Sequence, residues 1–153
     1  MTRTPKRTPP APEASGPLVA LCAGHRCEAL HRLADDQTGT ERLRATVSRS
    51  RGAVLVSTPC LGACASGAVA AVARRDGGTG TTGPSVWLGG VDRPATLAAL
   101  LGWVDSGGPS STDLPARDAP TTLREAILGI GHPIRARGAD TETGAGARPD
   151  LTA

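Results

Sequence analysis

The chain contains four cysteines, which form two pairs, each placed directly after a short apolar run. Cys22 ends the run PLVALC and Cys27 follows after four residues, whereas Cys60 and Cys64 follow the run AVLVST and are separated by three residues. Short apolar runs rich in Val and Leu are typical of buried strands. If the two runs are neighbouring strands of an open α/β sheet, both cysteine pairs lie where the functional groups of such sheets usually gather.

The segment between the two runs predicts how they are connected. Residues 38–52 predict a helix, because Thr38 and Glu41 have the spacing of a capping box. A strand, a crossover helix and a second strand give a right-handed parallel pair in nearly all proteins. We therefore expect the strands over 17–22 and 53–58 to be parallel neighbours.

The sequence after the second cysteine pair predicts three further elements. Strands are expected over 67–74 and 85–90, on either side of the Gly-rich turn DGGTGTTGP, and a helix over 92–108. The turn resembles a phosphate-binding loop only in its glycine content, because it has no suitably placed lysine and no helix follows it. The helix carries an apolar stripe formed by Leu97, Leu100, Leu101 and Val104. The predicted order is β-α-β-β-β-α, which indicates a small α/β sheet.

Composition along the chain predicts one structured domain, over residues 18–108. Residues 1–17 contain five prolines and are expected to be a disordered arm. Residues 109–153 are expected to form a linker, one short helix and a flexible tail. The short helix is predicted from the spacing of Leu123, Ile127 and Ile130.

The predicted core has almost no aromatic side chains. The chain has no Phe and no Tyr, and its two tryptophans, Trp87 and Trp103, are interpreted as packing residues. A core of Val, Leu and Ala buries less apolar area per residue, so the net stability is expected to be small. A bound cofactor could supply further stability.

Charge and hydropathy exclude several classes of function. The 17 basic and 14 acidic residues form no basic patch with interleaved aromatic residues, so nucleic-acid binding is not expected. No apolar run approaches the length of a spanning helix, and the Pro-rich start has no signal-peptide core, so we expect a cytoplasmic protein. No acid–base or nucleophile constellation is visible, and we do not expect an enzyme.

The four thiols are best explained as ligands. A cytoplasmic protein rarely forms disulfides, and four thiolates complete the ligand set of one tetrahedral zinc ion or one 2Fe-2S cluster. Gaps of three and four residues are wider than the C-x2-C of structural zinc sites, which favours the larger cluster. Unrelated buried thiols remain an alternative, and a dithiol redox protein is less well supported because C-x-x-C is absent. Small residues that let backbone N–H groups approach the sulfurs surround the cysteines: Gly24, Gly62, Ala63, Ala65, Ser66 and Gly67.

Over residues 18–105, the chain resembles the thioredoxin-like 2Fe-2S ferredoxin family. The resemblance is carried by C-x4-C after the first strand, by STPCLGACASGAV after the second, and by SVWLGGV with the closing LLGWVDSGG. It implies a thioredoxin-like fold, a one-electron carrier between a reductase and an acceptor enzyme, and often a homodimer. The cluster ligands that it implies are Cys22, Cys27, Cys60 and Cys64. The alternative function is a metal-binding module, either a structural zinc domain or a cluster-based redox sensor.

The histidines are not needed as ligands when four cysteines suffice. His25 lies between two predicted ligands and could replace a cysteine as in a Rieske centre, but we interpret it as a solvent-facing loop residue. Arg26 could offset the negative charge of a cluster or contact an acidic partner, and it is equally compatible with simple solvation. His31 and His132 lie outside the ligand loops and are assigned no role.

Overall fold

The computed structural model describes residues 14–36, 38–59 and 64–134. In this part of the chain, five strands form one open sheet in the order β2-β1-β3-β4-β5. The strands are β1 (Gly16–Cys22), β2 (Val54–Thr58), β3 (Ala70–Arg75), β4 (Ser85–Leu88) and β5 (Ile127–Gly131). The fold is therefore of the mixed α/β class that the sequence predicts.

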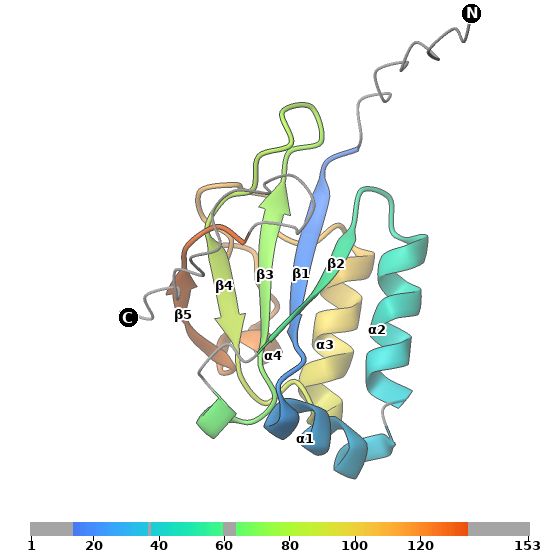
Figure 1. The fold of residues 1–153 in the computed structure, drawn as a ribbon. Coiled ribbons are helices and arrows are strands. Elements are labelled where there is room, and N and C mark those ends of the chain that lie inside the picture. The colour runs from blue at the N-terminus through green and yellow to red at the C-terminus, as the bar shows by residue number, and fades with distance from the viewer. Residues whose placement is uncertain (1–13, 37, 60–63, 135–153) are drawn as a thin grey trace, which may run out of the picture.

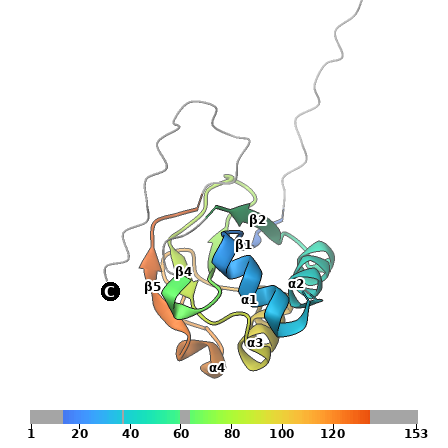
Figure 2. The same cartoon turned by 60° about the horizontal axis from the view of Figure 1, so that its bottom comes forward.

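Four α-helices accompany the sheet, and Figures 1 and 2 show α2 and α3 side by side on one of its faces. The first helix, α1, lies across the edge of the sheet at which β1 ends (Figure 1). A short 3-10 helix, η1, precedes β3. The helices are α1 (His25–Asp35), α2 (Thr38–Arg49), η1 (Cys64–Ser66), α3 (Pro94–Asp105) and α4 (Thr121–Arg124).

The predicted pairing of the first two strands is confirmed. β1 and β2 are parallel, with a register that runs from Leu18 opposite Val54 to Cys22 opposite Thr58. β3, β4 and β5 extend the sheet in antiparallel fashion on the other side of β1. Gly52 ends the turn after α2 with a φ of 76°, a left-handed conformation that glycine adopts without strain.

The core lies between the sheet and the helices α2 and α3, and small side chains dominate it as the composition predicts. Alanines and valines of β1 and β3 pack with Trp87 and with leucines of the two helices. Trp87 is fully buried, and its indole Nε1 donates a hydrogen bond of 3.1 Å to Ser85 Oγ. The buried apolar side chains of α2 and α3 in this core are Leu43, Val47, Leu97, Leu100, Leu101, Trp103 and Val104.

The predicted order β-α-β-β-β-α is incomplete at the first connection. The crossover between β1 and β2 contains two helices, because α1 precedes α2 and holds Cys27 within a helix instead of a loop. The buried residues of α1 are Cys27 and His31, whereas Leu33 is 84% exposed. Since the buried face has no aliphatic stripe, the hydrophobic pattern used to predict helices was not present.

The sheet and core also extend beyond residue 108. The single helix predicted from Leu123, Ile127 and Ile130 is wrong, because α4 ends at Arg124 and the chain then forms β5. Leu123 is fully buried and Ala119 nearly so, which makes the regions predicted as a linker and a short helix part of the same core. Gly131 lies against the Trp87 indole, where any side chain would collide.

The two terminal segments of the sequence carry predictions that the structure does not test. The arm predicted for residues 1–17 lies mostly outside the described part, although Gly16 and Pro17 belong to β1. The tail predicted at the end of the chain lies outside the described residues from 135 onward.

Candidate metal centre

The two cysteine-bearing connections leave the sheet at the same edge. Cys22 is the last residue of β1 and is level with Thr58, the last residue of the parallel strand β2. The Ala23 amide donates to the Thr58 carbonyl at 2.7 Å, and the Thr58 hydroxyl donates to the Leu21 carbonyl at 3.5 Å. These bonds hold the segment after Cys22 against the segment that leads to Cys60.

A third segment joins this edge. The Cys22 amide donates to the Val69 carbonyl at 3.1 Å, and Val69 comes just after the second cysteine pair. The end of β1 therefore lies between the chain that enters the second cysteine loop and the chain that leaves it.

The first pair of predicted ligands is buried together. Cys22 is 1% exposed and Cys27 is fully buried, and both belong to the same buried cluster. Gly24 precedes α1 in an extended conformation, and its carbonyl accepts a hydrogen bond of 2.9 Å from the Glu28 amide. Cys27 thus lies in the first turn of α1.

The second pair lies largely outside the described residues. Cys60 is outside them, and Cys64 is placed only by its backbone, at the start of η1. The structure therefore brings Cys22 and Cys27 together and leaves the positions of the other two sulfurs undescribed.

The exit from the second cysteine loop is fixed by the connection between β4 and α3. The Asp92 carboxylate accepts a hydrogen bond of 3.0 Å from the Ala68 amide, and the Val91 amide donates to the Ala68 carbonyl at 3.0 Å. Gly67 has a φ of 91° and packs against the backbone of Gly90, so a side chain at position 67 would be strained. Asp92 is the first residue of the helix predicted over 92–108, and the sequence pattern gave no sign of this contact.

His31 is a second residue that sequence analysis missed. It lies one helical turn after Cys27 and is only 4% exposed. Burial lowers the pKa of His31 below the ordinary value of 6.5, although the nearby carboxylates of Asp92 and Asp35 oppose this change. Within the described part of the chain, its Nε2 has no hydrogen-bond partner. The four-residue spacing from Cys27 was the available signal, but it has meaning only once the segment is known to be a helix.

His25 and Arg26 are exposed on the first turn of α1. The prediction of a solvent-facing histidine between the first two cysteines is confirmed, although His25 belongs to a helix and not to a loop. His132, which was assigned no role, is exposed beyond the end of β5.

The described residues test the fit of a metal only in part. No three His, Cys, Asp or Glu side chains within them form a group that could hold a metal ion, but that set excludes the sulfurs of Cys60 and Cys64. Two observations fit a ligand here: two thiols are buried together at a shared sheet edge, and a buried imidazole on the same helix face has an unpartnered nitrogen.

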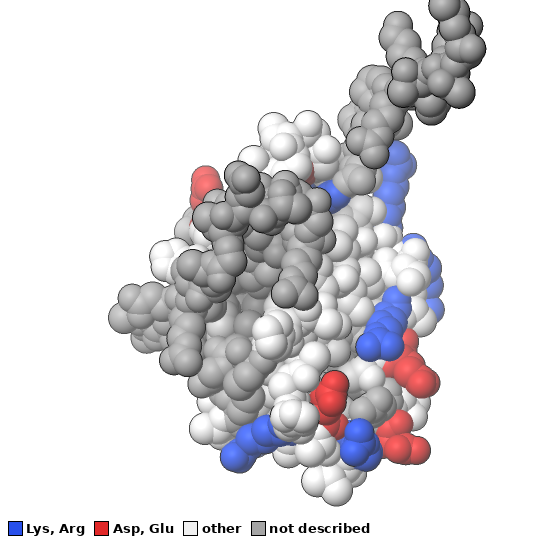
Figure 3. Space-filling model, viewed as in Figure 1, with Lys and Arg blue, Asp and Glu red and all other residues white. Residues whose placement is uncertain are grey.

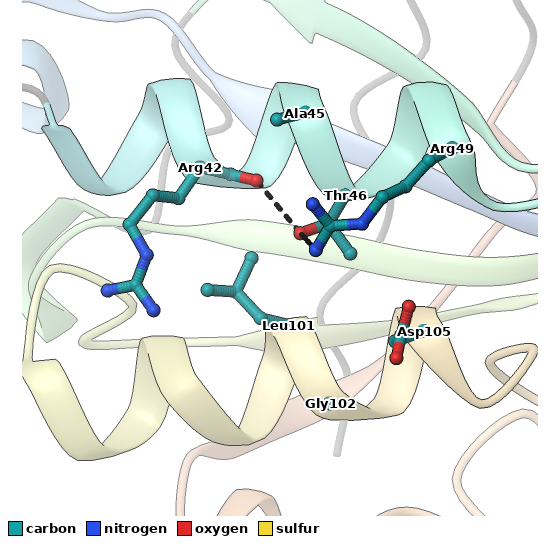
Figure 4. A pocket seen from close by; sticks show the side chains of 7 residues that line it. All are labelled: Arg42, Ala45, Thr46, Arg49, Leu101, Gly102 and Asp105. Carbon is teal, nitrogen blue, oxygen red and sulfur yellow. Dashed lines mark hydrogen bonds between the residues drawn. The ribbon is translucent and has the colours of Figure 1, made fainter.

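A pocket of about 260 Å³ lies elsewhere, between α2 and α3 (Figure 4). Arg42 and Arg49 of α2 and Asp105 of α3 line it, and the Thr46 hydroxyl donates to the Arg42 carbonyl at 2.9 Å. The pocket contains no predicted ligand. On the face seen in Figure 3, the basic and acidic residues of the described part are interspersed and form no broad patch of one sign.

Comparison with protein-family models, with curated proteins and with solved structures gave no match. No helix in the described ranges is long and apolar enough to cross a membrane.

Proposed function

We propose that this protein is a thioredoxin-like ferredoxin, which binds one 2Fe-2S cluster and carries single electrons between a reductase and an acceptor enzyme. The observation that carries the proposal is the shared sheet edge at which β1 and β2 end. Parallel pairing in register places Cys22 level with Thr58, two residues before Cys60. A ligand set drawn from two loops needs such convergence.

The arrangement of the elements supports the thioredoxin-like part of the proposal. A parallel strand pair joined by a helical crossover, an antiparallel hairpin and a closing helix are the elements that the sequence resemblance implies. The helix α1 and the strand β5 are additions to that plan.

The ligands proposed are Cys22, Cys27, Cys60 and Cys64. When bound, a 2Fe-2S cluster supplies a site that gains and loses one electron. The chain's own contribution is to bury the first thiol pair, to place Cys27 in the first turn of α1, and to fix the exit of the second loop through Asp92. Burial and hydrogen bonding to the sulfurs then set the reduction potential.

The decisive experiment is anaerobic purification of the full chain, followed by measurement of iron, sulfide, zinc and visible absorbance. We expect two irons and two sulfides per chain, visible colour in the oxidised state, and a paramagnetic signal after one-electron reduction. A colourless protein with one zinc would contradict the electron-carrier function and support the alternative metal-binding module.

Single substitutions then test the ligand set. Cys22→Ser, Cys27→Ser, Cys60→Ser and Cys64→Ser are each expected to lower the iron content and change the spectrum. His25→Gln is the matched control, because this exposed residue lies between two proposed ligands and its loss should leave both unchanged. Loss of the cluster in His25→Gln, with its retention in one cysteine variant, would indicate a Rieske-type ligand set instead.

The partners and location follow from the proposed function. We propose redox partner proteins and a cytoplasmic location, with neither nucleic acid nor membrane as a partner, and a homodimer as the assembly to be tested. Sedimentation of the purified holoprotein distinguishes a monomer from a dimer.

A further inference from the structure

Two buried side-chain atoms in the described part of the chain have no hydrogen-bond partner, His31 Nε2 and Trp103 Nε1. An unsatisfied buried polar atom costs about 1–3 kcal/mol, and in native proteins it often marks a group that meets a ligand, ion or water. Trp103 lies near the C-terminal end of α3, a helix that carries no cysteine. His31 lies on α1, the helix that carries Cys27.

The geometry of α1 directs His31 toward the cysteine site. Residues four apart lie on the same helix face, and helical side chains lean toward the N-terminus. The imidazole of His31 therefore extends over the turn that contains Cys27, and both residues face the buried side of the helix.

The other surroundings of His31 tie it to the second cysteine loop. Asp92, whose charge acts on the imidazole, also accepts the hydrogen bond of the Ala68 amide. Ala68 follows η1, the 3-10 helix that begins at Cys64. His31 thus belongs to the helix that holds Cys27, and its imidazole feels the charge of Asp92, the residue that binds the segment just after Cys64.

We infer that His31 donates a hydrogen bond from Nε2 to a sulfur of the cluster site and thereby raises its reduction potential. The inference rests on the proposed function. A neutral imidazole protonated at Nε2 is a donor, and donors to the sulfurs of an iron–sulfur centre stabilise its reduced, more negative form. Burial keeps competing water away from this bond.

An effect of His31 on the reduction potential can be distinguished from an effect on folding. Because Nε2 has no hydrogen-bond partner among the residues that the structure describes, replacing His31 by Leu removes no hydrogen bond between this atom and those residues. It removes a desolvated polar group instead, which is close to neutral or stabilising when the shape is kept. If His31 had a purely structural role, its replacement by Leu would instead lower the stability of the cluster-free protein.

The test compares His31→Leu, His31→Gln and the exposed control His25→Gln in the full chain. Reduction potentials are measured by anaerobic optical titration at constant pH, and urea unfolding is measured on the cluster-free forms. We expect a more negative potential in His31→Leu, an intermediate value in His31→Gln because its amide can donate, and no shift in His25→Gln. Stability of the cluster-free His31→Leu protein should match or exceed that of the wild type at pH 8.

Two results would overturn the inference while leaving the proposed function intact. Equal potentials in all variants would mean that Nε2 meets only a water molecule, and a large loss of stability in cluster-free His31→Leu would assign His31 a structural role. If His31→Leu does not assemble a cluster, the comparison of His31→Gln with wild type decides. A wild-type protein that binds no cluster at all would instead refute the proposed function and this inference together.

Discussion

At the residue scale, the most informative side chains are those that the sequence pattern did not single out. His31 and Asp92 lie 61 positions apart in the numbering, yet they act on one another across the end of the sheet. Spacing along the sequence identified the cysteines, because the members of each pair are near in sequence. It could not identify a pair that only tertiary packing brings together.

The lowered pKa of His31 predicts a pH-dependent stability. The unfolded state takes up a proton below about pH 6.5, whereas the folded state resists protonation until a lower pH. The folded state therefore carries no cost from His31 protonation above about pH 6.5, and the free energy of unfolding decreases as the pH falls from there toward the folded pKa. Urea unfolding of the cluster-free protein at pH 8 and pH 5 should show a larger decrease in wild type than in His31→Gln. His132→Gln, which changes an exposed histidine, should retain the wild-type dependence.

The hydrogen bond from the Ala68 amide to the Asp92 carboxylate, called the Asp92 clamp here, predicts that removing this carboxylate lowers the stability of the fold. Asp92→Ala leaves the Ala68 amide without its acceptor, which should lower the free energy of unfolding by about 1–2 kcal/mol. The exposed Asp105→Ala is the control, because within the described residues no group is found that donates a hydrogen bond to its carboxylate. Under the proposed function, Asp92→Ala should also hold less iron after purification than Asp105→Ala. Equal unfolding midpoints and m-values in the two variants would contradict the clamp.

At the element scale, the strands β1 to β4 and the helices α2 and α3 could be predicted, but α1 and β5 could not. The strands β1 and β2 were predicted correctly because they are short apolar runs. The helix α3 was predicted correctly because its apolar stripe has a helical period. The helix α1 buries a cysteine and a histidine, packs Leu30 only partly against the core and exposes Leu33, so it lacks a clear aliphatic stripe. β5 was read as a helix from the spacing of two isoleucines, although its two glycines disfavour helices and one of them permits the contact with Trp87.

The same elements predict where the domain ends. Leu123 is fully buried in the segment that composition marked as outside the domain, so Leu123→Ala should cost about 2–4 kcal/mol of unfolding free energy. Leu114, in the same segment, is 57% exposed, and Leu114→Ala should change the stability by less than about 0.5 kcal/mol. Chemical denaturation of both variants makes the comparison. Similar small effects would mean that the structured domain ends near residue 108.

At the scale of the whole molecule, a core of small side chains is joined to a proposed cofactor at one end of the sheet. The buried cluster contains many alanines and valines and only two aromatic residues, so each buried position contributes little transfer free energy. The cysteines of the first pair belong to that same cluster. A ligand that joins both cysteine loops would therefore act on the stability of the fold as well as on its chemistry.

This coupling predicts that the metal-loaded protein unfolds at a higher temperature than the cluster-free form. A ligand that binds only the folded chain stabilises it by mass action, about 2.7 kcal/mol at a free concentration one hundred times its Kd. Thermal unfolding of the anaerobic protein before and after iron chelation measures the difference. Cys22→Ser keeps a similar small buried side chain but removes one proposed ligand, so chelation should shift its unfolding temperature much less. If chelation leaves the wild-type unfolding temperature unchanged while the iron is lost, the metal does not hold the two loops together, and the four cysteines are not a single ligand set.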